Sequence, residues 1–182
     1  MRKANLLTIP TVAIVVVVAS GIHGSASVER APGWDHFQAK PSPAPTAVDA
    51  CSLLTKEDAV SAVGEALDSA KASGPLPVPM GGIDTTVTGC AYESPRSVHN
   101  IKLTVHRVSN DKAARFKQFY QSVCSRKECV SGLGDMAWWY SGQHDELQVL
   151  KNATLLIFKL SRNGDGKEAL QGAAKKALAR LQ

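Results

Sequence analysis

The chain is organised around one strongly apolar stretch, Ala153-Thr154-Leu155-Leu156-Ile157-Phe158-Lys159-Leu160-Ser161. Successive side chains of a β-strand point to opposite faces, so apolar residues would lie on both faces of a strand here. One face would carry Leu156, Phe158 and Leu160, and the other Leu155 and Ile157. A strand that is apolar on both faces needs cover on both sides, or a place in the middle of a sheet. The stretch therefore predicts a central strand.

Further segments supply partners for this strand. Apolar and alternating patterns predict strands at residues 136–140 and 146–151, and further upstream at 85–94 and 98–108. The 98–108 segment alternates cleanly between apolar and polar residues, which is typical of an antiparallel sheet with one solvated face. Residues 68–84 are rich in glycine and proline and are predicted as a loop with room for a short edge strand.

Three amphipathic helices complete the predicted fold. The first runs over residues 56–67, where Thr55 and Asp58 form a capping pair at its start. The second begins at a cap on Ser109 or Asn110 and ends near Cys124, and the third covers residues 167–181. The order predicts an α+β fold with an antiparallel sheet of about five to six strands and three helices. A weak internal duplication follows from this pattern, since strands are followed by a helix twice.

The N-terminus has the pattern of an export signal. Two basic residues precede the apolar run 4–22, and small residues end at Ala26, so residues 1–26 are predicted as a signal peptide. Cleavage after Ser20 is an alternative, and the length of the run leaves an uncleaved membrane anchor as another. Residues 27–49 are predicted as a Pro/Ala-rich linker, and residues 50–182 as a single disulfide-stabilised α+β domain.

The overall charge argues against one class of function, the binding of nucleic acids. The whole chain has a formal net charge of +5, and removal of the two basic residues in the signal leaves +3. This is far short of the basic surface that nucleic-acid binding requires, so no nucleic-acid partner is expected. Membrane contact is expected only through an uncleaved anchor. The predicted location is exported, either secreted or in the periplasm or cell envelope.

All four cysteines, Cys51, Cys90, Cys124 and Cys129, lie after the signal segment. An even number in an oxidising compartment indicates disulfides, and four cysteines allow three pairings. Cys51–Cys90 with Cys124–Cys129 is favoured because only four residues separate the second pair at a predicted helix end. A metal site is the competing interpretation, but the tight cysteine or histidine pairs typical of zinc are missing, so no metal or cofactor is predicted.

Four motifs follow one another along the chain: Cys51-Ser52-Leu53-Leu54-Thr55-Lys56-Glu57-Asp58-Ala59, Val63-Gly64, Cys90-Ala91-Tyr92 and Gly132-Leu133-Gly134-Asp135-Met136-Ala137-Trp138. In this order they resemble a family of small exported bacterial proteins and lipoproteins, common in actinobacteria, of unknown function. The resemblance covers about residues 49–182. It implies a fold, an extracytoplasmic location and the pairing of the first two cysteines. The chain departs from the family in its second cysteine pair and in lacking a cysteine that could carry a lipid.

Few residues suggest chemistry. Gly132 and Gly134 lack the third glycine of a phosphate loop and lead into a strand, so they predict a tight turn whose Asp135 bonds backbone amides. His144 is followed by Asp145 and Glu146, and a small secreted hydrolase could use a histidine paired with one of these acidic residues. No serine or cysteine sits in a recognisable nucleophile elbow, so no catalytic residue is assigned.

The aromatic run Trp138-Trp139-Tyr140 is the strongest candidate for a contact surface. Trp138 and Tyr140 would share one face of a strand, with Trp139 on the other. Plain core packing is the favoured interpretation, and a set of exposed aromatics that binds a partner is the alternative. The sequence therefore predicts an exported non-catalytic binding domain for an unknown protein or small-molecule ligand. A hydrolase that uses His144 with Asp145 or Glu146 is the alternative.

Overall fold

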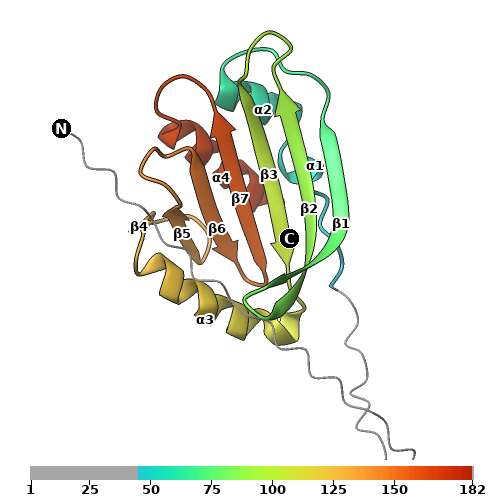
Figure 1. The fold of residues 1–182 in the computed structure, drawn as a ribbon, viewed down its shortest axis with the longest axis vertical. Helices are drawn as coiled ribbons and strands as arrows, with labels where there is room; N and C mark the ends of the chain where they lie inside the picture. The colour runs from blue at the N-terminus through green and yellow to red at the C-terminus, as the bar shows by residue number, and fades with distance from the viewer. Residues whose placement is uncertain (1–44, 182) are drawn as a thin grey trace, which may run out of the picture. The chain divides into compact units, whose positions relative to one another are not determined.

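A computed structural model describes residues 45–181 of the chain (Figure 1). The predicted signal peptide, and nearly all of the predicted linker, lie outside the described residues. The described part contains one antiparallel sheet of seven strands together with four α-helices, so the predicted α+β class is confirmed and the predicted counts were slightly low. Among the helices in residues 45–181, none is long and apolar enough to span a bilayer.

The strands follow the spatial order β1-β2-β3-β7-β6-β5-β4. Their bounds are β1 Lys71–Met80, β2 Ile83–Glu93, β3 Asn100–Arg107, β4 Glu128–Cys129, β5 Met136–Trp139, β6 Glu146–Lys151 and β7 Thr154–Ser161. The stretch predicted to be central is β7, which pairs with β3 on one side and with β6 on the other. Every neighbouring pair is antiparallel.

The two additional strands lie at the edges of the sheet. β1 occupies most of the segment predicted as a loop with room for a short edge strand, and β4 is only two residues long. Pro75, Pro77 and Pro79 hide β1 from sequence patterns, because proline cannot donate to a sheet ladder. An edge strand is paired on one side only, so it tolerates proline where a central strand does not.

The helices are α1 Ala50–Leu53, α2 Lys56–Val63, α3 Ala113–Cys124 and α4 Lys167–Arg180, and a 3₁₀ turn at Asn110–Lys112 precedes α3. The helix that was not predicted from the sequence is α1, which is a single turn. Its N-cap is Asp49, whose side chain accepts a hydrogen bond from the Cys51 amide. Thr55 caps α2 as predicted. This helix ends at Val63 rather than at residue 67, because Gly64 takes a left-handed conformation with φ +89° and closes it.

Helices cover the two sheet faces unequally. Figure 1 shows α1, α2 and α4 behind the sheet, and α3 alone across the lower end of the other face. The larger core lies under α1, α2 and α4, where Phe158 of β7 is buried. The smaller core lies under α3 and contains Leu155 of β7 together with Phe116 and Tyr120 of α3. β7 thus has apolar contacts on both faces, as its sequence predicts.

Candidate functional site

Trp138 and Trp139 are both buried, as the favoured interpretation of core packing expects. Trp138 and Trp139 expose 0% and 2% of their surface, whereas Tyr140 exposes 54%. Trp138 stacks on Tyr120 of α3 with ring centroids 5.3 Å apart, and Trp139 belongs to the core on the opposite face. The two rings point to opposite faces of β5, and both faces are covered by a hydrophobic core, so both rings are buried. Only Tyr140 is exposed, and the Lys127 ammonium lies 4.7 Å from the centre of its ring.

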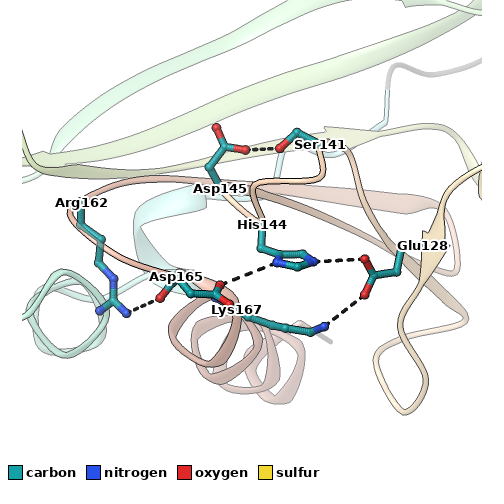
Figure 2. A network of polar contacts seen from close by, with 7 residues as sticks. All are labelled: Glu128, Ser141, His144, Asp145, Arg162, Asp165 and Lys167. Carbon is teal, nitrogen blue, oxygen red and sulfur yellow. Dashed lines mark hydrogen bonds and ion pairs between the residues drawn. The ribbon is translucent and has the colours of Figure 1, made fainter.

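His144 lies in the turn between β5 and β6, where its backbone has a φ of +53°. Its Nε2 atom is 3.1 Å from Glu128 Oε2, and its Nδ1 atom is 3.8 Å from Asp165 Oδ1. The ring also meets Trp139 edge-on, with centroids 4.9 Å apart. Figure 2 shows the imidazole held between the two carboxylates, which come from β4 and from the segment just before α4.

The acidic residues adjacent to His144 in sequence have other partners. The Asp145 carboxylate accepts a hydrogen bond from the Ser141 hydroxyl, and Figure 2 shows this pair apart from the imidazole. Glu146 Oε1 accepts a hydrogen bond from Gln148 Nε2 at 2.7 Å. The structure therefore pairs His144 with Glu128 and Asp165, and it contains no serine hydroxyl bonded to the imidazole within residues 45–181.

Lys167 completes what we call the His144 network, formed by Glu128, His144, Asp165 and Lys167. Lys167 Nζ is 3.1 Å from Glu128 Oε1, and the Lys167 amide donates to Asp165 Oδ1 at 2.8 Å. Hydrogen bonds from His144 and Lys167 lower the pKa of the Glu128 carboxyl. Three of the four side chains are exposed by 41% or more. The network therefore lies at the surface, where it connects β4 to the start of α4.

Asp135 closes the glycine-containing turn before β5. Its Oδ2 atom accepts a hydrogen bond from the Asn152 amide at 2.9 Å, and its Oδ1 atom is 3.4 Å from Lys151 Nζ. Burial raises the pKa of this carboxyl, but the contacts with Asn152 and Lys151 lower it by more. The pKa of Asp135 is therefore lowered overall. Asp135 thus bonds a backbone amide, and the amide belongs to the neighbouring β6–β7 turn rather than to its own turn.

The cysteines behave as two different pairs. Cys51 and Cys90 form a disulfide that joins α1 to β2. Cys124 and Cys129 are free thiols, so the structure differs from the predicted second bridge. The Cys129 thiol donates to the Cys124 carbonyl at 3.2 Å, and this carbonyl at the end of α3 also accepts a hydrogen bond from the Lys127 amide at 3.0 Å. Burial, together with the neighbouring Cys129 thiol, raises the pKa of the Cys124 thiol to about 11.

Sequence reasoning missed two groups of basic residues. Lys102 and Lys159 are paired across β3 and β7. At the other end of these strands, Arg107 of β3 and Lys151 of β6 lie on either side of Thr154 of β7. Within its own strand, each of these residues resembles any other polar residue of the sequence. Only the lateral register of the sheet brings them together, so no local pattern could have identified them.

The fold and these residues define a disulfide-linked α+β domain with surface ion-pair networks and two clusters of basic side chains. Within the described residues, no group of three or more histidine, cysteine, aspartate or glutamate side chains is placed to hold a metal ion. Comparison with known proteins finds no family model that matches the sequence and no curated protein that matches it.

Proposed function

We propose that this chain is an exported, non-catalytic binding domain of the bacterial envelope or secreted fraction, and that part of its sheet contacts an acidic protein segment. The single observation that carries the proposal is the pairing of Lys102 on β3 with Lys159 on β7. Both lysines are exposed and stand directly opposite each other.

The contact surface lies on the same sheet face as α3 but beyond the helix. Its centre is formed by four partly or fully exposed side chains: Lys102, Thr104, Ile157 and Lys159. We call them the open sheet face. Because side chains alternate along a strand, these four point away from Leu103 and Phe158, which are buried under the helices of the opposite face. In Figure 1, α3 crosses only the lower end of the sheet, so no helix among the described residues covers this surface.

The facing lysines oppose folding. Like charges that stand directly opposite each other destabilise a sheet by a few tenths of a kcal/mol to about 1 kcal/mol. Glu146 pairs with Lys159 on its other side, but its carboxylate bonds Gln148 and forms no ion pair with either lysine among the described residues. A positively charged, partly apolar surface kept at a cost in stability favours recognition of carboxylate-bearing side chains.

Two features support export. The N-terminal segment has the charge and hydropathy pattern of a secretory signal. The Cys51–Cys90 disulfide closes a loop that spans 39 positions, and such structural disulfides persist in oxidising compartments.

Charge reversal on the open sheet face tests the proposal. Lys102→Glu replaces the facing like charges by an opposite-charge pair, whereas Lys175→Glu makes the same charge change on the exposed side of α4. The readouts are urea unfolding and the fluorescence anisotropy of a labelled octaglutamate peptide at low salt. We expect Lys102→Glu to raise stability by about 0.5 kcal/mol and to abolish peptide binding, with wild-type binding falling as salt is added. Equal loss of binding in both variants, or no binding by the wild type, would contradict the proposal.

A separate assay tests the hydrolase alternative. Wild type, His144→Gln and Ser141→Ala are incubated with chromogenic esters, amides, glycosides and phosphate esters. We expect no turnover above that of heat-denatured protein, because His144 and Ser141 bond different partners. Turnover by the wild type that disappears in His144→Gln would overturn the non-catalytic assignment.

A further inference from the structure

We infer that a small oxyanion, such as phosphate or a phosphate group on a small organic molecule, binds in a hollow just beyond the C-terminal end of α4. The hollow has a volume of about 260 Å³. Its lining includes Arg107, Asn110, Lys151, Asn152, Thr154 and Leu181. Each water molecule fills roughly 30 Å³ of liquid volume, so the space admits an anion of several heavy atoms with part of its hydration shell.

The sheet register brings the two cations to one place. Thr154 on β7 pairs with Arg107 on β3 and with Lys151 on β6. Directly paired residues point to the same face, and neighbouring strands lie about 4.8 Å apart. The Arg107 and Lys151 backbones are therefore roughly 10 Å apart across Thr154, a span that both long side chains can close over one ligand.

The polar groups around the hollow are available to a ligand. Within residues 45–181, the side chains of Arg107, Asn110 and Thr154 form no hydrogen bond or ion pair. Lys151 contacts Asp135, but this carboxylate lies outside the lining and is shared with Lys117, whose Nζ is 3.9 Å from it. The lining contains two basic side chains and no acidic one.

One feature of the hollow opposes anion binding. Leu181 is the C-cap of α4, and the carbonyls at a helix C-terminus carry a partial charge of about −0.5. Arg107 and Lys151 each carry a full positive charge, so the positive potential prevails. An arginine fork and a lysine ammonium are also the donors that proteins use for oxyanions, and the Thr154 hydroxyl adds a further donor between them.

This site is independent of the open sheet face. Arg107 follows the buried residues of β3 in alternation and so lies on the α4 side, whereas Lys102 lies on the α3 side. Failure of one proposal therefore leaves the other standing.

The test uses the full chain in an NMR titration of backbone amides with sodium phosphate, against sodium chloride at matched ionic strength. We expect saturable shifts at Asn110, Asn152 and Thr154 with phosphate only. Arg107→Gln and Lys151→Gln each remove one cation, whereas Lys175→Gln removes an equal charge from the exposed side of α4. We expect the first two to weaken phosphate binding at least tenfold, or about 1.4 kcal/mol, and the control to leave it unchanged.

A parallel titration with glycerol phosphate separates a free ion from a phosphate group on an organic molecule. Tighter binding than that of phosphate assigns the site to an organic phosphate that also contacts Leu181, and equal binding assigns it to the free ion. If Arg107→Gln fails to fold, Arg107→Lys replaces it in the test. This variant keeps the charge but loses the planar guanidinium, so we expect its phosphate affinity to lie between those of the wild type and Lys151→Gln. Identical shifts with chloride, or equal weakening in Lys175→Gln, would refute the inference.

Discussion

Replacement of Asp58 by asparagine tests how the helical layer is held together. The Asp58 side chain is 5% exposed and lies in the first turn of α2. Its Oδ1 atom is 2.9 Å from Lys176 Nζ and its Oδ2 atom is 2.5 Å from Arg180 Nη1, both on α4. The Thr55 hydroxyl also donates to Oδ2 at 3.1 Å. Asparagine keeps the shape of this side chain but removes the charge on which the two bases depend.

The size of the effect follows from the pKa of Asp58. Burial raises this pKa, but hydrogen bonds from Lys176, Arg180 and Thr55 lower it more, and the result is about 2 instead of 3.8. A difference of roughly 1.8 pH units corresponds to about 2 kcal/mol of folding free energy at neutral pH. Lys176 and Arg180 are 53% and 37% exposed, so water solvates them when the carboxylate is lost. The loss should therefore stay below the roughly 3–5 kcal/mol of a fully buried pair.

The pH dependence has a definite sign. The folded-state pKa of Asp58 lies below its unfolded value, so the stabilisation is complete above about pH 4 and declines as the pH falls towards 2. The asparagine variant has no carboxylate at this position and cannot lose this contribution. Wild type and variant should therefore converge in acid.

The measurement is urea unfolding at pH 7 and pH 2, followed by the fluorescence of the buried Trp138 and Trp139. We expect Asp58→Asn to lose about 2 kcal/mol at pH 7 and less than about 1 kcal/mol at pH 2. Asp111→Asn, an exposed change in the 3₁₀ turn, serves as the control and should stay within about 0.5 kcal/mol of wild type. No loss at pH 7, or an equal loss at both pH values, would refute this account of the α2–α4 contact.

Three further predictions follow from local geometry. Replacing both Cys51 and Cys90 by serine should lower the free energy of unfolding by about 4 kcal/mol, measured in urea, because their bridge spans 39 positions. Gly134→Ala should cost at least about 1 kcal/mol more than Gly132→Ala in the same assay. Both glycines have positive φ, but an added Cβ would lie 2.5 Å from the Leu150 carbonyl oxygen at Gly134 and would meet nothing within 4 Å at Gly132. Thiol titration of unreduced native protein should find two free thiols, with exposed Cys129 reacting before half-buried Cys124; finding none would restore the second disulfide.

Much of the fold could be predicted because local chemistry decides it. The two-sided apolar pattern of residues 153–161 placed β7 in the middle of the sheet, and the Thr55 cap placed the start of α2. The two edge strands could not be predicted in the same way. β1 carries three prolines and β4 has two residues, so their strand conformation comes from pairing with β2 and β5 rather than from intrinsic preference.

The candidate sites were less accessible to sequence reasoning. Trp138 and Trp139 were correctly placed on opposite strand faces, but their burial depends on α3 on one side and on the core under α4 on the other. His144 was recognised as a titratable turn residue, yet its partners Glu128 and Asp165 are 16 and 21 positions away in the chain. The phosphate site was not recognised, because it combines residues from β3, β6, β7 and the end of α4.

By itself, the sequence determined five of the seven strands, three of the four α-helices and which side chains of each predicted strand share a face, because these depend on short-range periodicity and capping. The tertiary structure alone decided which residues meet across strands and which faces are covered. Lys102 opposes Lys159, and Arg107 joins Lys151, only because β3 pairs with β7 in one particular register. A period of two specifies a face but not a neighbour, and neighbours are selected by the packing of the whole sheet between its helices.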